Sequence, residues 1–243
     1  MSVAATRPVA VVTGGAKRLG RHLCLSLSSR GYDVVIVYRT SEDDARSLER
    51  AIAAGGGRAR AYKLDVTDKA AVAAAFAGIA ATEGRVDLLV NNVGNYNPQD
   101  VTTLDPDVWD ATIASNLSGA YYCCYGALAL MPDGGNIVNI GMAGLDGIRA
   151  NRRGADYYVS KTGLLVLTRA LAAAYASRHI RVNMVSPGQL ENSVDLPPPE
   201  ELSRWVPLAR SGTLDDIAQA VHYLLDASYV TGMNIDVAGG YRL

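Results

Sequence analysis

The sequence has no excess of either charge. Its 243 residues carry 23 lysines and arginines against 24 aspartates and glutamates, a formal net charge of −1 at pH 7. Nucleic acids and anionic membranes attract proteins through clustered positive charge, so we expect neither as a partner. The hydrophobic share of 49% is large enough to bury a full core, which excludes a mainly disordered chain.

Long apolar runs are also missing. Residues 1–15 contain one arginine and an apolar stretch that is too short for a signal peptide or a membrane span. This stretch continues directly into a strand pattern. We therefore expect a cytoplasmic protein with no membrane partner.

Cysteine and histidine are scarce. The three cysteines, Cys24 and the adjacent Cys123 and Cys124, lack the spacing of metal ligands, and the three histidines lie in no motif. We expect buried thiols and no metal site.

Serine and threonine are absent between Ser118 and Ser160. Within this gap, NIVNIGMAGLDG (residues 136–147) has the pattern of a buried strand that continues into a glycine-rich loop. An α/β enzyme often places a catalytic hydroxyl in such a loop. The chemistry has therefore been lost, moved to another group, or never needed this hydroxyl.

Short β-branched runs alternate with helical spacing along the whole chain. This alternation predicts an α/β fold with a seven-stranded parallel sheet and helices on both faces. No linker divides the chain, so we expect a single domain over residues 1–243, with an irregular, proline-rich loop at about 188–212. The predicted strands are VAVVT, DVVIVY, ARAYKLD, VDLLVNN, GNIVNIG, RVNMVSP and NIDVAGG.

The first predicted strand ends in a glycine-rich turn, TGGAKRLG (residues 13–20), and a helix follows to about Arg30. In such a turn, backbone N–H groups and the helix dipole face a pyrophosphate. We expect a dinucleotide to bind here. The residues expected to contact it are Gly14, Lys17, Arg18, Leu19 and Gly20.

The second predicted strand ends at Tyr38, where a site for NAD usually has an acidic residue for the ribose hydroxyls. Arg39 follows, with Thr40 and Ser41. A guanidinium group forms two charge-assisted hydrogen bonds to a phosphate, so Arg39 with Ser41 and Lys17 or Arg18 would hold the 2′-phosphate of NADP(H). NADP(H) is the predicted cofactor.

Six motifs, in this order and at this spacing, resemble the short-chain dehydrogenase/reductase family over essentially the full length. The resemblance implies one Rossmann domain with sheet order 3-2-1-4-5-6-7. It also places Asp65 and Val66 at the adenine and Asn91 and Gly94 along the ribose. The resemblance adds further cofactor-binding residues, namely Asn92, Tyr157, Lys161, Pro187 and Gly188. The motifs are Thr13-Gly14…Gly20, Asp65-Val66, Asn91-Asn92-Val93-Gly94, Asn116 within an expected long helix, Tyr157-x-x-x-Lys161 and Asn183-x-x-x-Pro187-Gly188.

Two residues depart from the family pattern. Arg18 stands where the family usually has a third glycine, and TGGAKRLG is similar to the variant found in pteridine reductases, whose arginine reaches the cofactor phosphates. This resemblance also favours NADPH. The second departure is Val93, in place of the usual alanine in a packed turn.

Tyr157 and Lys161 lie four residues apart in a predicted helix, so their side chains share one face. A free tyrosine has a pKa of about 10, and a nearby ammonium lowers that pKa because it stabilises the phenolate. The resemblance implies that Tyr157 protonates the substrate, Lys161 lowers the pKa of Tyr157 and binds the nicotinamide ribose, and Asn116 anchors a water relay. Tyr158 has no lysine four residues later.

The family's catalytic serine has no counterpart. Counting back from Tyr157 gives Gly144, and counting forward from Asn139 gives Met142, so the loop carries an insertion and neither position has a hydroxyl. Three hypotheses stay open. In the first, a protonated Asp146 replaces the serine hydroxyl, as an Asp does in pteridine reductases. In the second, a backbone N–H of Met142–Gly144 or a bound water replaces it. In the third, nothing replaces it and the enzyme is slow and specialised. Asp146 is otherwise a turn residue.

The resemblance favours an NADPH-dependent carbonyl reductase similar to 3-oxoacyl-carrier-protein reductases. The alternatives are a pteridine-reductase-like enzyme and a nucleotide-binding protein with low activity. We expect a small carbonyl substrate, which Arg149, Arg152 and Arg153 would contact if it is anionic or carrier-bound, with Tyr96 and Trp205 as an aromatic wall. Two helical segments, from Ala120 and from Leu164, are apolar on more than one face, which favours a homotetramer or homodimer.

Overall fold

The strands form one parallel sheet in the order β3-β2-β1-β4-β5-β6-β7. The computed structural model describes residues 7–145, 147, 151–193 and 196–241. The strands are β1 (Val9–Thr13), β2 (Asp33–Tyr38), β3 (Ala59–Lys63), β4 (Leu88–Asn91), β5 (Asn136–Ile140), β6 (Arg181–Pro187) and β7 (Asn234–Val237). The predicted α/β class and strand order are confirmed.

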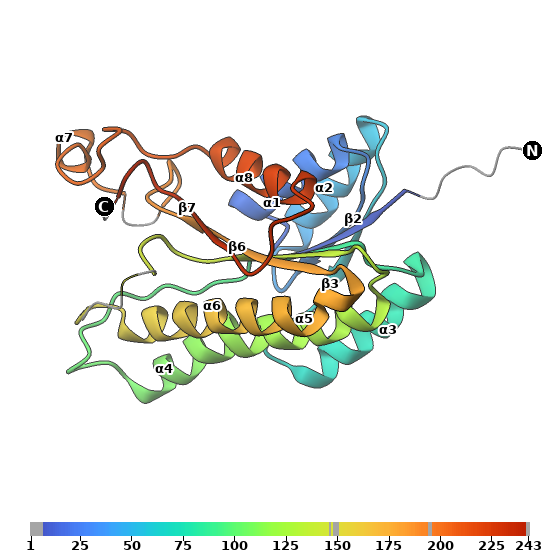
Figure 1. The fold of residues 1–243 in the computed structure, drawn as a ribbon, viewed down its shortest axis with the longest axis horizontal. Helices are drawn as coiled ribbons and strands as arrows, with labels where there is room; N and C mark the ends of the chain where they lie inside the picture. The colour runs from blue at the N-terminus through green and yellow to red at the C-terminus, as the bar shows by residue number, and fades with distance from the viewer. Residues whose placement is uncertain (1–6, 146, 148–150, 194–195, 242–243) are drawn as a thin grey trace, which may run out of the picture.

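Helices cover both faces of the sheet (Figure 1). On one face lie α1 (Arg18–Ser29), α2 (Glu42–Ala54) and α8 (Leu214–Asp226), and on the other lie α3 (Lys69–Glu83), α5 (Gly119–Leu130) and α6 (Ala155–Tyr175). The shorter helices are α4 (Pro106–Ile113), the π-helical η1 (Ala114–Ser118), η2 (Ala176–Arg178) and α7 (Pro199–Leu202). In the part of the chain that the structure describes, no helix combines the length and apolarity needed to cross a bilayer.

The central strands are buried on both sides, which explains their continuous runs of apolar residues. Every residue of β1 and β2 is buried, and Val11 pairs with Val35 on one side and with Leu89 on the other. Because all strands are parallel, their carboxyl ends meet at one edge of the sheet. That edge receives the turns that follow β1, β2, β3 and β4.

The structure corrects two details of the predicted elements. The long helix expected around Asn116 is interrupted by η1, where the hydrogen bonds shift to a π pattern. The expected loop at 188–212 contains the helix α7, and its ends are paired. Glu191 N–H donates to the Gly212 carbonyl (2.9 Å) and Gly212 N–H donates to the Gln189 carbonyl (2.8 Å).

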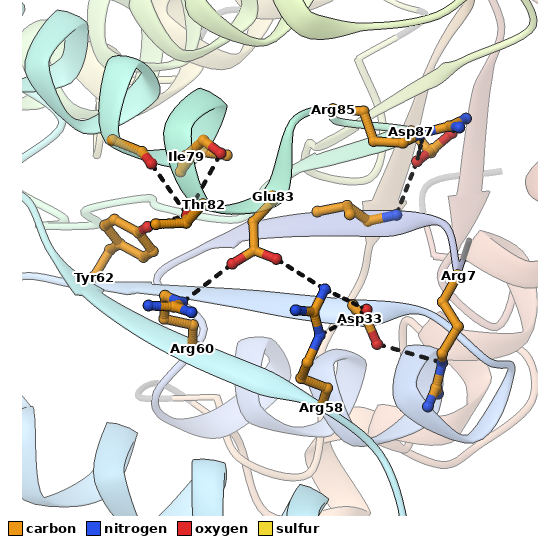
Figure 2. A network of polar contacts seen from close by, with 12 residues as sticks. Arg7, Asp33, Arg58, Arg60, Tyr62, Ile79, Thr82, Glu83, Arg85 and Asp87 are labelled. Atoms are coloured by element: carbon orange, nitrogen blue, oxygen red, sulfur yellow. Dashed lines mark hydrogen bonds and ion pairs between the residues drawn. The ribbon is translucent and has the colours of Figure 1, made fainter. Parts of the chain in front are cut away.

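An ionic network links β3, an edge strand of the sheet, to the end of α3 and the start of β2 (Figure 2). The Glu83 side chain, which is only 4% exposed, accepts from Arg58 (3.0 Å) and Arg60 (3.1 Å), and Arg58 also contacts Asp33 (2.6 Å). Edge strands expose unpaired backbone groups that invite association with another chain. The charged side chains around β3 protect this edge.

The three cysteines are buried, as predicted. Burial raises the pKa of both Cys123 and Cys124 to about 12. At neutral pH these thiols are therefore protonated and unreactive.

Candidate active site

The glycine-rich turn after β1 depends on two glycines. Gly14 has φ of 62°, in the left-handed region that favours glycine. A Cβ on Gly20 would lie 2.1 Å from the Gly14 carbonyl oxygen, so only glycine lets α1 start this close to the turn. Leu19 and Gly20 are buried beneath the turn and hold it in place.

Arg18 also has a positive φ, of 48°. The position where the family usually has a glycine therefore keeps a backbone conformation that suits glycine, at a cost of about 1–2 kcal/mol for an arginine. The Arg18 side chain is exposed. Whether it contacts the cofactor phosphates stays a prediction.

A cleft of about 480 Å³ opens at the carboxyl edge of the sheet. Its lining contains eight of the predicted cofactor-binding residues: Gly14, Lys17, Arg39, Thr40, Ser41, Asp65, Val66 and Gly94. The prediction missed further lining residues: Ala16, Val37, Tyr38, Leu64, Thr67, Val93, Asn95, Ala111, Ala114 and Ser115. Most of these adjoin predicted residues at the strand ends. Ala111, Ala114 and Ser115 come from α4 and η1, so sequence proximity gave no signal for them.

Both cations of the cleft lie next to carboxylates. Arg39 is 3.6 Å from Asp65, and Lys17 is 3.0 Å from Asp44 in the first turn of α2. The Thr67 backbone N–H, with a smaller contribution from Arg39, holds the pKa of Asp65 below its usual value. Asp65 is therefore ionised at neutral pH and keeps Arg39 at the rim of the cleft.

The two asparagines at the end of β4 hold strands and turns together. Asn92 Nδ2 donates to the carbonyls of Thr13 (3.1 Å) and Gly14 (3.2 Å), which fixes the glycine-rich turn. Asn91 is buried, and its Nδ2 donates to Asn139 Oδ1 (2.9 Å). Asn91 thus links β4 to β5 inside the core and does not lie along the cleft, where the resemblance placed it.

Pro187 and Gly188, at the end of β6, lie outside the cleft lining. The Ala143 N–H donates to the Pro187 carbonyl (3.0 Å), and Gly188 N–H donates to the Val237 carbonyl (3.0 Å). A Cβ on Gly188 would lie 2.9 Å from Ala238. These residues close the end of the sheet next to the loop after β5.

Lys161 is buried beside Tyr157. Its Nζ donates to the Ile140 carbonyl (2.8 Å) and lies 5.6 Å from the centre of the Tyr157 ring. Desolvation lowers the pKa of Lys161 to about 8. A Cβ on Gly94 would lie 3.2 Å from Lys161 Nζ, so the lysine adjoins the cleft through Gly94.

Asn116 is fully buried in η1 and is held by the Asn95 backbone. Asn95 N–H donates to Asn116 Oδ1 (2.7 Å), and Asn116 Nδ2 donates to the Asn95 carbonyl (2.9 Å). Asn116 Nδ2 also donates to Ser160 Oγ (3.1 Å), and Ser160 Oγ donates to the Tyr157 carbonyl (2.7 Å). Ser160, which the prediction missed, thus connects Asn116 to the turn that carries Tyr157.

Two backbone N–H groups of the loop after β5 already donate hydrogen bonds to other residues. Ala143 N–H donates to Pro187, and Gly144 N–H donates to Asp236 Oδ2 (2.7 Å). This removes both from the backbone groups proposed to replace the missing serine. Asp146 lies outside the described residues, and so does Arg149. Arg152 forms an ion pair with Asp100 (3.1 Å).

Tyr96 packs its ring edge-on to Tyr157, with ring centres 5.0 Å apart. Trp205 instead packs on Tyr241, with ring centres 5.7 Å apart. Of the two aromatic residues expected at the substrate site, Tyr96 therefore lies against the predicted proton donor, and Trp205 packs against the C-terminal segment.

A family model described as enoyl-(acyl carrier protein) reductase matches residues 14–242. The chain belongs to the short-chain dehydrogenase/reductase family. A 3-oxoacyl-(acyl-carrier-protein) reductase of Staphylococcus aureus is 33% identical over 95% of this chain and 96% of its own length. A 3beta-hydroxysteroid dehydrogenase of Eggerthella lenta is 35% identical over 96% of this chain and 93% of its own length.

A solved structure of a blue fluorescent protein from a metagenomic library, in complex with NADPH, has a TM-score of 0.90. The two sequences are 33% identical, and the match covers 97% of this chain and 98% of the solved chain. The family match and this neighbour confirm the prediction of an NAD(P)-binding oxidoreductase of the short-chain family. The two relatives are named for a 3-oxoacyl carrier protein and a 3beta-hydroxysteroid, so family membership shows an oxidoreductase and leaves the substrate open.

Proposed function

We propose that this protein is an NADPH-dependent reductase that converts a ketone or a 3-oxoacyl compound to an alcohol. The observation that carries the proposal is the position of Tyr157 and the buried Lys161, whose Nζ lies 5.6 Å from the Tyr157 ring and adjoins the cleft of about 480 Å³ through Gly94. A phenol next to an ammonium suits proton transfer to a substrate oxygen.

The residues of the cleft fit NADPH. The turn at Gly14–Gly20 leaves no room for a side chain at Gly20, which allows the backbone to approach a pyrophosphate. Tyr38 replaces the acid that would repel a 2′-phosphate, and Lys17, Arg39 and Ser41 line the same end of the cleft. When bound, the dinucleotide supplies the hydride that reduces the carbonyl carbon.

Residues of this chain donate the proton and replace it. Tyr157 donates its hydroxyl proton to the carbonyl oxygen, and the Lys161 ammonium stabilises the phenolate that remains. Asn116, fixed by the Asn95 backbone and by Ser160, anchors the relay that returns a proton toward Lys161. Because Lys161 is 2% exposed, its charge acts on Tyr157 with little screening by solvent.

The absent serine lowers the rate without abolishing the reaction. Loss of one donor to a developing oxyanion costs roughly 10²–10³ in rate. The engaged N–H groups of Ala143 and Gly144 leave the Met142 backbone, a bound water or Asp146 as the replacement. The proposed enzyme therefore works with Tyr157 as its main donor.

The alternative is reduction of a C=N bond in a pterin. The Tyr96 ring, which packs against Tyr157, and Arg18 in the glycine turn support it. A low-activity nucleotide-binding protein is the third reading, and the complete set of Tyr157, Lys161 and Asn116 argues against it.

Consumption of NADPH with a panel of ketones, 3-oxoacyl thioesters and biopterin separates these functions. We expect turnover with a carbonyl compound, and a higher kcat/KM with NADPH than with NADH. Turnover of biopterin alone would favour the pterin reductase. Binding of NADPH without turnover of any compound would favour the nucleotide-binding protein.

We also propose that the chain forms a homotetramer through α5 and α6. These helices expose apolar side chains that a monomer would leave in water, namely Tyr121, Tyr125, Val159 and Val166. Light scattering should give four copies, and Tyr125→Lys should reduce that number.

We further propose that the loop at about 188–212, which follows β6, is the loop that contacts the substrate.

A further inference from the structure

Thr112 and Asp156 form a fully buried pair between α4 and α6. Both residues have no exposed surface, and Thr112 Oγ1 donates to Asp156 Oδ2 at 2.7 Å. Asp156 directly precedes Tyr157 in the first turn of α6, and Thr112 lies in the last turn of α4, four residues before Asn116. The pair therefore joins the two segments that carry the proposed catalytic side chains.

A second connection runs parallel to this pair. Ser115 Oγ lies 3.3 Å from the Thr112 carbonyl and 2.9 Å from Asn116 Oδ1, so it ties η1 to the end of α4. From Asn116 the contacts continue through Ser160 to the Tyr157 carbonyl. With the Thr112–Asp156 bond, these contacts close a ring around the interface between η1 and the first turn of α6.

The buried Asp156 side chain does not by itself stabilise the fold. Asp156 Oδ1 has no hydrogen-bond partner among the described residues, and a buried polar atom without a partner is costly. The N-terminus of α6 offsets part of this cost, since a helix N-terminus favours negative charge. An apolar pair of similar size would pack α4 on α6 without this cost, so a purely structural role does not explain the residue types.

We infer that the Thr112–Asp156 pair positions Tyr157 relative to Asn116 and Lys161 for catalysis. The inference rests on the proposed role of Tyr157 as proton donor. The Thr112–Asp156 bond fixes the rotation and height of the first turn of α6 against η1. Without it, the Tyr157 hydroxyl would lose its alignment with the substrate. Neither residue of the pair lines the cofactor cleft, so we expect the cofactor contacts to be affected less.

The test is Thr112→Val, which keeps the shape of the side chain and removes its donor, with Thr112→Ser restoring the hydroxyl. We expect Thr112→Val to lower kcat about tenfold with unchanged KM and Kd for NADPH, because small misalignments are expensive in catalysis. Thr112→Ser should recover most of kcat. An unchanged kcat in Thr112→Val, or a loss that Thr112→Ser fails to recover, would overturn the inference.

Thr168→Val is the matched control. Thr168 is equally buried, lies in α6, and its Oγ1 accepts from Asn139 Nδ2 (2.8 Å) away from the α4 interface. We expect this variant to lose thermal stability and keep kcat per folded molecule. An equal loss of kcat in Thr168→Val would show that any buried hydrogen bond of α6 has this effect, and would also overturn the inference.

A crystal structure of Thr112→Val separates this inference from the proposed function. If the wild-type chain reduces no compound of the panel, the proposed function is wrong and kcat cannot test the inference. The structural claim is then read from the distance between Lys161 Nζ and the Tyr157 ring centre, which is 5.6 Å here. A longer distance or a rotated Tyr157 in the variant supports positioning, and an unchanged site overturns it.

Discussion

The Nζ atom of Lys161 lies 5.6 Å from the centre of the Tyr157 ring, and both residues belong to α6. Because burial disfavours its charged form, Lys161 has a pKa of about 8, below the 10.5 of a free lysine. Lys161 is therefore protonated at neutral pH and loses its proton as the pH rises through about 8.

This pKa predicts the pH dependence of carbonyl reduction. Above about pH 8 the ammonium that stabilises the Tyr157 phenolate disappears, so kcat/KM should fall with an apparent pKa near 8. Lys161→Arg, whose guanidinium stays charged, should lose this step in the profile, even if its activity is lower. A wild-type kcat/KM that stays level through this range would contradict the assignment.

Arg39 and Lys17 should determine the choice of cofactor. Arg39→Ala should lower kcat/KM with NADPH by about 10- to 100-fold, because a hydrogen bond to a charged group contributes about 1.5–3 kcal/mol. The value with NADH, which has no 2′-phosphate, should change little. Equal losses with both cofactors in steady-state assays would mean that Arg39 does not contact the 2′-phosphate.

Asp44→Asn is the complementary change at the same rim. It removes the carboxylate that lies 3.0 Å from Lys17 and would repel a phosphate, so the Kd for NADPH should decrease. The effect should weaken at high salt, since both side chains are about half exposed. Fluorescence titration at two salt concentrations measures it. A weaker binding of NADPH would show that Asp44 instead holds Lys17 in a productive position.

The Tyr96 contact with Tyr157 involves the rings. Tyr96→Phe keeps the edge-on packing and should keep kcat within about threefold, whereas Tyr96→Ala should lower kcat about two- to tenfold, the range expected for losing an aromatic pair. A large loss in Tyr96→Phe would instead identify the Tyr96 hydroxyl as the replacement for the missing serine.

The network beside β3 should contribute to stability and not to activity. Glu83→Gln removes the charge that Arg58 and Arg60 share, and should lower the free energy of unfolding by about 1–2 kcal/mol, because both arginines are half exposed. Urea unfolding gives this value. The kcat per folded molecule should stay the same, since the network in Figure 2 does not line the cofactor cleft.

The strands and the cofactor turn were predictable because they depend on local patterns. The apolar runs place the central strands, and the glycines at 14 and 20 place the dinucleotide turn. Tyr157 and Lys161 were predictable because one helical turn separates them. In each case the signal lies within a few residues of the feature.

The remaining features depend on contacts between distant segments. The Thr112–Asp156 pair and the engagement of the Gly144 N–H by Asp236 join residues far apart in the sequence. The same is true of Asn91, whose side chain was expected near the ribose and bonds to Asn139 instead. Sequence spacing cannot give these contacts because they arise only when the strands and helices pack.

The most direct test compares Tyr157→Phe with Tyr158→Phe, its neighbour on α6, in NADPH-dependent reduction of the best carbonyl substrate. Rates and the Kd for NADPH should be measured on the same preparations. We expect Tyr157→Phe to bind NADPH like the wild type and to lose at least about 10²-fold in kcat, the usual contribution of general acid catalysis. Tyr158→Phe should keep most of its activity. A Tyr157→Phe variant that turns over at the wild-type rate would contradict the assignment of Tyr157 as proton donor.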